Sequence, residues 1–104
     1  DNLNPEECIK KETEEETGFI VTQVQKVLQA YMSPGSMTEI LHFFVAEYND
    51  TLKKNEGGGL KEEGEDIEVL ELNFNTAMEM ISSGEIKDAK TIILLYHAKI
   101  NNLV

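Results

Sequence analysis

The 104-residue sequence has one cysteine, no tryptophan and few bases, and these shortages restrict what it can do. The single cysteine, Cys8, excludes an internal disulfide framework and favours a reducing compartment such as the cytoplasm. No apolar run reaches the roughly 18 residues that a membrane-spanning helix needs, so we expect no membrane partner. Nine bases stand against twenty acids, for a net charge of -11. This balance argues against a nucleic-acid partner, because binding to phosphates depends on lysine and arginine.

The composition that remains is that of a small globular domain. The chain is 40% hydrophobic, which is typical of a folded protein, and its length fits one domain. Its acidity has two interpretations at this point: a soluble, self-repelling surface, or carboxylates grouped to hold a divalent cation that recruits an anionic substrate. The distribution of the acids along the chain has to decide between them.

The order of the predicted elements indicates an α+β fold. A helix over residues 5–17 begins at the capping residue Asn4 and ends at Gly18. Apolar patterning predicts three strands and two further helices, which lie within residues 19–32, 38–48, 68–72, 76–83 and 88–101. Asn75 is the expected cap of the helix over residues 76–83.

Two segments in the middle of the chain carry further expectations. The strand within residues 38–48 is almost continuously apolar, which predicts that both of its faces are covered. A sheet of three strands would leave open edges, through which copies of the chain could associate. Residues 49–66 form a long polar loop with many acids. Its three glycines, Gly57–Gly59, predict flexibility and a lid that closes over substrate.

The first helix carries the strongest chemical signal. Glu12, Glu15 and Glu16 stand at i, i+3 and i+4, which places their carboxylates on one face. Like charges at these spacings repel by roughly 0.2–0.5 kcal/mol per pair, and acids in the last turn oppose the helix dipole by about 0.3–1 kcal/mol each. A divalent cation would turn this repulsion into coordination, because hard cations bind clustered oxygens.

Residues 11–19 resemble the distal half of the motif of the Nudix hydrolase family. That motif reads Arg-Glu-apolar-x-Glu-Glu-x-Gly-apolar, and its glutamates and glycine correspond to Glu12, Glu15, Glu16 and Gly18. Two positions depart from it, since Lys11 replaces the arginine and Thr13 replaces the apolar residue. Lysine keeps the charge but loses the planar fork that could orient a glutamate bidentately.

Downstream segments are similar to the branch of the family that hydrolyses GDP-mannose and ADP-ribose. The similar segments are residues 31–35, 38–48, 57–59, 65–72 and 84–91. The resemblance implies an α/β/α sandwich, of which residues 1–104 are the C-terminal part of one Nudix domain without its N-terminal strands. It also implies an enzyme acting on acid anhydrides, which cleaves the pyrophosphate of a nucleoside-diphosphate sugar into a nucleoside monophosphate and a sugar phosphate.

The resemblance further implies a metal site and a catalytic base. Glu12, Glu15 and Glu16 would hold Mg²⁺, with Mn²⁺ as the expected substitute, and Glu15 would also take part in catalysis. An acid of the later loop usually completes such a site, and here Glu65 is predicted as a ligand and Glu63 as the general base. Whether Glu63 or Glu65 is the base stays open.

The resemblance implies substrate contacts at Pro34, Gly35 and Glu39, and a homodimer. Two alternatives remain. The chain could be a catalytically incomplete fragment that self-associates through an exposed sheet edge, or a plain acidic binder of divalent cations without nucleotide preference. Turnover of a nucleotide sugar would distinguish a Nudix hydrolase from both alternatives.

Overall fold

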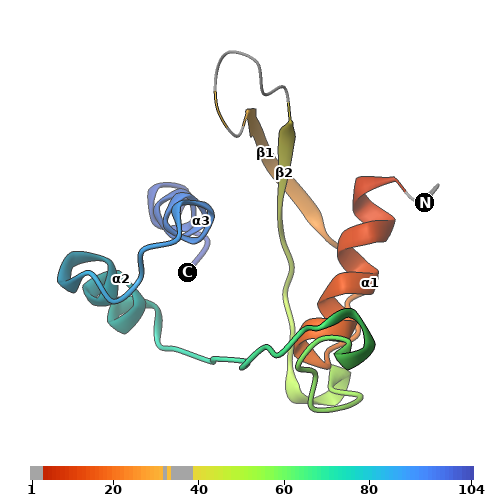
Figure 1. Cartoon of the computed structure of the whole chain (residues 1–104). Coiled ribbons are helices and arrows are strands. Elements are labelled where there is room, and N and C mark those ends of the chain that lie inside the picture. Colours follow the sequence, from red (N-terminus) through yellow and green to blue (C-terminus); the bar gives the residue numbers. More distant parts are fainter. Residues whose placement is uncertain (1–3, 32, 34–38) are drawn as a thin grey trace. The chain divides into compact units, whose positions relative to one another are not determined.

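The computed structural model describes residues 4–31, 33 and 39–104 (Figure 1). The chain divides into two compact units, Asp1–Val69 and Leu70–Val104. Helices occur in both units, and the first unit also holds a small antiparallel sheet, so the predicted α+β class is confirmed. Within the described ranges no helix is both long enough and apolar enough to cross a bilayer.

Helix α1, Pro5–Thr17, forms where its end signals predict it. The Asn4 side chain caps the first turn by accepting the backbone N–H of Glu7 at 2.9 Å, and Pro5 occupies the first turn, where no intrahelical donor is needed. Gly18 ends the helix in the left-handed conformation, with φ of 83°. An L-residue with a side chain adopts this conformation only at a cost, which explains the glycine.

Strands β1, Gln25–Tyr31, and β2, Ile40–Val45, form an antiparallel pair, which confirms strands within two of the predicted ranges. The register runs from Gln25↔Val45 to Tyr31↔Ile40 and shifts between Lys26 and Leu28, where one strand holds an extra residue. Phe43 is only 4% exposed, whereas His42 beside it is exposed. The prediction that β2 is covered on both faces is therefore wrong, because alternate residues of this strand face solvent.

The buried core of the first unit consists of Phe19, Val21 and Phe43. The Phe19 ring packs edge-on against Tyr48, with 4.8 Å between the ring centroids. An isolated bridge pairs Phe19 with Lys53, and the backbone N–H of Ile20 donates to the carbonyl oxygen of Leu52 at 2.9 Å. These contacts bring the segment after β2 back to the C-terminal end of α1.

The strand predicted over residues 68–72 is absent, which corrects the expectation of a three-stranded sheet. The sheet contains β1 and β2 alone in the part of the chain that the structure describes. Just before this segment, the backbone N–H of Ile67 donates to the Gly58 carbonyl oxygen at 2.9 Å, in a loop and not in a ladder. Alternating side chains are not sufficient for a strand, since a strand forms only where a second strand pairs with its backbone.

The second unit contains helices α2, Phe74–Ser83, and α3, Ala89–Ile100. Asn73 caps α2, because its side chain accepts the backbone N–H groups of Asn75 and Thr76 at 2.9 and 3.3 Å. The prediction of Asn75 as the cap was therefore wrong by two positions. Asp88 caps α3 through the N–H of Thr91, at 2.9 Å, which confirms the predicted start of that helix.

Exchanging the two asparagines for alanine tests this assignment. Asn73→Ala removes the side-chain acceptor from the first turn of α2, and we expect it to lower the free energy of unfolding by about 1 kcal/mol. Asn75→Ala is the matched control, because Asn75 contributes only a backbone donor to the cap. Urea unfolding followed by circular dichroism measures both. Equal decreases in the free energy of unfolding of the two variants would contradict the assignment of Asn73 as the cap.

Candidate metal centre

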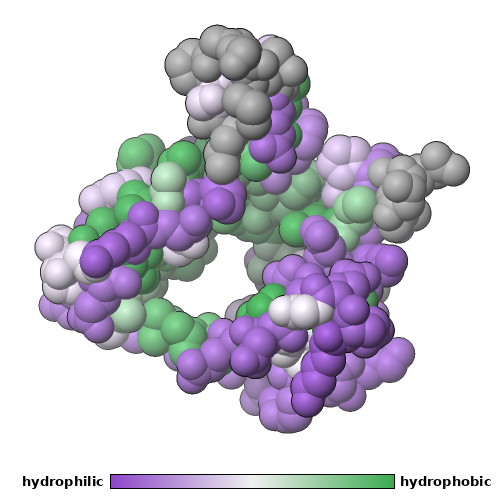
Figure 2. Space-filling view, viewed as in Figure 1, coloured by the Kyte–Doolittle hydropathy of each residue, from purple (hydrophilic) through white to green (hydrophobic). Residues whose placement is uncertain are grey.

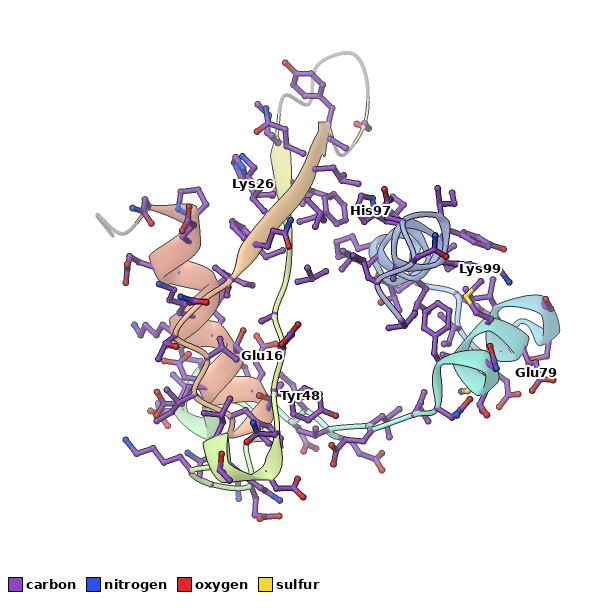
Figure 3. All side chains as sticks on the ribbon, turned by 180° about the vertical axis from the view of Figure 1, so that it is seen from behind. Glu16, Lys26, Tyr48, Glu79, His97 and Lys99 are labelled. Carbon is purple, nitrogen blue, oxygen red and sulfur yellow. The ribbon has the colours of Figure 1, made fainter. Side chains whose placement is uncertain are left out.

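The C-terminal half of α1 carries three of the predicted ligands on one face. Glu12 is exposed, whereas Glu15 and Glu16 are half-buried, and Figure 3 shows Glu16 on this part of the helix. Glu14 has a different environment, since its carboxylate lies 3.7 Å from the Lys54 ammonium. The structure therefore separates Glu14, the acid that the motif leaves unspecified, from the other three.

Lys11 takes the place of the arginine in the motif and makes a weaker contact than an arginine could. Its Nζ lies 4.0 Å from Oε2 of Glu15, and its side chain is 62% exposed. An exposed single contact of this kind stabilises by about 0–1 kcal/mol. Lys11 thus supplies charge near Glu15 without fixing the orientation of its carboxylate.

The glycine segment Gly57–Gly59 binds the last turn of α1 through its backbone. The N–H groups of Gly58 and Gly59 donate to the carbonyl oxygens of Glu16 and Glu15 at 2.8 and 2.9 Å. The last carbonyls of a helix have no partner within the helix, so these bonds satisfy groups that would otherwise need water. Gly58 and Gly59 are thus bonded to α1 in this structure, and the predicted lid movement stays a prediction.

Glu65 is the loop acid that the structure ties to the glycine segment. Its Oε1 accepts the backbone N–H of Leu60 at 2.6 Å, and its own N–H donates to the Leu60 carbonyl oxygen at 3.1 Å. Glu63 instead ends the short 3-10 helix η2, Lys61–Glu63, and is exposed. Of the two loop acids predicted from sequence, Glu65 is the one held beside α1.

The pKa of the Glu16 carboxyl depends on the three other predicted ligands. Burial is the largest cause that raises the pKa of the Glu16 carboxyl, followed by the negative charges of Glu12, Glu65 and Glu15. Glu65 therefore acts on Glu16 although almost fifty residues separate them in the chain. On the face that Figure 2 shows, hydrophilic residues predominate around α1 and residues 49–66.

Four carboxylates are the type of donor that Mg²⁺ prefers, so the residues fit the cation in chemistry. Their side chains do not converge on a common point in this structure. Across the described residues, no three histidine, cysteine, aspartate or glutamate side chains are grouped closely enough to hold a metal ion. The glutamate side chains have the rotatable bonds that would be needed to converge on a cation.

Of the three predicted substrate residues, the structure describes only Glu39. Pro34 and Gly35 lie outside the described residues. Glu39 is exposed just before β2, at the end of the hairpin where Tyr31 pairs with Ile40. The C-terminal end of α1 meets residues 52–58 near the opposite end of the hairpin (Figure 1).

The sequence reasoning missed the role of the glycine segment, whose backbone completes the end of α1. Three successive glycines signal close approach of two backbones as well as flexibility. The spacing along the chain did not show which of these applied, because the partner carbonyls belong to Glu15 and Glu16, far away in sequence.

The raised pKa of Glu16 predicts how stability depends on pH when no metal is present. The folded chain holds this proton more tightly than the unfolded chain. Glu16 therefore contributes stability that is fully present below the ordinary carboxyl pKa and is lost as pH rises through the raised pKa. We expect Glu16→Gln to stabilise the metal-free chain at neutral pH and to reduce that loss.

Urea unfolding in the presence of a chelator, between about pH 4 and pH 8, measures this effect around the carboxyl titration range. Glu14→Gln is the matched control: it removes one acid from the same turn but also breaks the ion pair with Lys54. A Glu16→Gln variant that is less stable than the native chain at neutral pH would contradict the expectation.

Comparison with known proteins identifies the family of this chain. The NUDIX domain matches residues 1–93. GDP-mannose pyrophosphatases of Shigella dysenteriae serotype 1 and of Escherichia coli O157:H7 are each 54% identical over all 104 residues, which make up 53% of their length. The chain thus spans about half the length of these curated relatives. A domain match over most of the chain, with glutamates at the motif positions of α1, shows that this protein belongs to the NUDIX domain family.

Proposed function

We propose that this chain belongs to an Mg²⁺-dependent enzyme that hydrolyses the pyrophosphate of a nucleoside-diphosphate sugar. The products are a nucleoside monophosphate and a sugar phosphate. The observation that carries the proposal is geometric: the loop that holds Glu65 is bonded to the carbonyl groups of Glu15 and Glu16 at the end of α1. The relatives named GDP-mannose pyrophosphatase support a GDP-mannose type of substrate, and ADP-ribose is the second substrate to test.

Each carboxylate has a proposed task. Glu12 and Glu16 bind the cation most directly, with Glu15 and Glu65 completing its oxygen ligands. When bound, Mg²⁺, or Mn²⁺ in its place, neutralises charge on the pyrophosphate and lowers the pKa of a water molecule. Glu15 takes part in catalysis at the same face of α1. Without a cation these acids repel one another and would also repel an anionic substrate, so substrate binding requires a cation.

The two loop acids divide into ligand and base in this proposal. The hydrogen bond from Leu60 to Glu65 and the charge of Glu65 near Glu16 support Glu65 as a ligand. Glu63 is exposed on η2, and it is proposed as the general base that accepts a proton from water.

The remaining proposals concern the substrate and the assembly. Pro34, Gly35 and Glu39 are proposed to contact the substrate, residues 1–104 to form part of a single domain, and the enzyme to act as a homodimer. The single cysteine supports a reducing compartment such as the cytoplasm.

Product analysis tests the proposed bond cleavage. The purified chain is incubated with GDP-mannose and Mg²⁺, in parallel with ADP-ribose, and the products are separated by ion-exchange chromatography. We expect GMP and mannose 1-phosphate in equal amounts, because cleavage occurs between the two phosphorus atoms. Release of GDP and free mannose would contradict the proposal, since it requires cleavage of the glycosidic bond.

A second candidate function follows from the open hairpin. β1 and β2 pair only with each other within the described ranges, and Tyr31 and Ile40 at its end are 66% and 40% exposed. Such edges pair readily with another strand, so the chain alone could be a self-associating, catalytically incomplete piece. Light scattering across a dilution series tests this, and a folded monomer at every concentration would argue against it.

A further inference from the structure

The backbone of the glycine segment lies unusually close to the last turn of α1. A Cβ atom at Gly57 would stand 2.5 Å from the Glu16 carbonyl oxygen and 2.8 Å from the Gly18 nitrogen. Both are backbone atoms, which cannot move aside as a side chain can. Together with the bonds from Gly58 and Gly59, this contact fixes the segment directly to the residues that carry the proposed ligands.

Gly59 connects that contact to Glu65. Its N–H donates to the Glu15 carbonyl oxygen at 2.9 Å, and a Cβ at Gly59 would stand 2.6 Å from Cβ and 2.8 Å from Oε1 of Glu65. The Glu65 side chain therefore occupies the space that a Gly59 side chain would fill. The N–H of the next residue, Leu60, holds the Glu65 carboxylate at 2.6 Å.

We propose that Gly59 is a positioning residue: it places the Glu65 carboxylate beside the last turn of α1 by leaving room for it while anchored to Glu15. The inference rests on the proposed function, in which Glu65 is a metal ligand. It extends that function by assigning a task to a residue that has no functional group. An alanine at Gly59 would push Glu65 away from α1, and so weaken metal binding without removing any ligand.

Gly64 provides a matched control in the same loop. Its φ is +77°, close to the +87° of Gly59, but a Cβ at Gly64 would meet nothing within 4 Å. Gly64→Ala therefore has the backbone strain of an alanine at positive φ, whereas Gly59→Ala has that strain and also displaces Glu65. A Cβ at Gly59 would also lie 3.2 Å from Cδ1 of Ile67, so the Glu65→Gln background is needed to isolate the effect on Glu65.

The experiment compares Gly59→Ala with Gly64→Ala, each in the native and in the Glu65→Gln background. Mn²⁺ affinity is measured by electron paramagnetic resonance, and stability by urea unfolding. We expect Gly59→Ala to weaken Mn²⁺ binding by about tenfold or more, the range for residues that orient a ligand, and Gly64→Ala to leave it unchanged. In the Glu65→Gln background, Gly59→Ala should weaken Mn²⁺ binding no further, although its loss of stability persists.

Different outcomes separate the inference from the function on which it rests. Equal Mn²⁺ affinity in Gly59→Ala and Gly64→Ala, with weaker binding in Glu65→Gln, would overturn the positioning role and leave the metal centre intact. Native affinity in Glu65→Gln would overturn the ligand role of Glu65 and the positioning role together.

If Gly59→Ala does not fold, Glu65→Asp tests the same placement. It keeps the charge and the Cβ beside Gly59, but it withdraws the carboxylate by one methylene from the Leu60 N–H. If Glu65→Asp loses about as much Mn²⁺ affinity as Glu65→Gln, the inference is supported. The position of the carboxylate, and not its charge alone, then determines Mn²⁺ binding. Native affinity in Glu65→Asp would overturn it.

Discussion

Glu16→Gln is expected to lower turnover of GDP-mannose by about a hundredfold or more, since a bound metal supplies several kcal/mol of transition-state stabilisation. Glutamine keeps the size and hydrogen-bonding capacity of the side chain but removes the negative charge. Glu16 is the carboxylate on which burial and the charges of Glu12, Glu65 and Glu15 converge. Losing this one charge should therefore reduce cation affinity more than losing any other acid of α1.

The control for this experiment is Glu14→Gln, which removes an acid from the same turn that pairs with Lys54 and not with the cluster. We expect its turnover to stay close to that of the native chain. Because Glu16→Gln should also stabilise the metal-free fold at neutral pH, lost turnover cannot be attributed to unfolding. Turnover by Glu16→Gln at the native rate would remove Glu16 from the metal centre.

Gly18→Ala is expected to have the largest effect on the fold. A Cβ atom at Gly18 would stand 1.9 Å from the carbonyl oxygen and 2.6 Å from the carbonyl carbon of Asn55, and 2.9 Å from the Gly57 nitrogen. Backbone atoms surround the position, so relief requires the loop to separate from α1. We expect the free energy of unfolding to fall by about 3 kcal/mol or more, at the upper end for single substitutions.

Gly64→Ala is again the control, because it adds the strain of a positive φ without a steric clash. Its φ of +77° resembles the +83° of Gly18, and nothing lies within 4 Å of its Cβ position. We expect Gly64→Ala to lower the free energy of unfolding only by the cost of a left-handed backbone, about 1–2 kcal/mol. Thermal unfolding of both variants provides the comparison, and losses of equal size would show that the loop does not press against the end of α1 as described.

Local signals explain why α1 could be predicted well from sequence. Its start at Asn4 and Pro5 and its end at Gly18 depend on residues within one turn of each end. The common face of Glu12, Glu15 and Glu16 follows from helical spacing alone. None of these features needs a contact with a distant part of the chain.

Features that depend on distant or competing partners were not predictable in the same way. Residues 68–72 have the alternation of a strand, but pairing needs a neighbour that the sequence does not reveal. Asn73 and Asn75 both precede an apolar run, and only the direction of the Asn73 side chain selects it as the cap. The bonds of the glycine segment to the carbonyl groups of Glu15 and Glu16 were not predictable either, because these partners are far away in the sequence.

A titration with Mn²⁺ tests most directly whether the carboxylate face of α1 and Glu65 hold a divalent cation, and it does not depend on turnover. The native chain is compared by electron paramagnetic resonance with the double variant Glu12→Gln/Glu16→Gln. Its control is Glu6→Gln/Glu7→Gln, which removes two exposed acids from the first turn of the same helix. Loss of the tightest Mn²⁺ site in the first double variant alone is the predicted result. Equal Mn²⁺ binding by both double variants would mean that the acids of α1 form only a solvated surface.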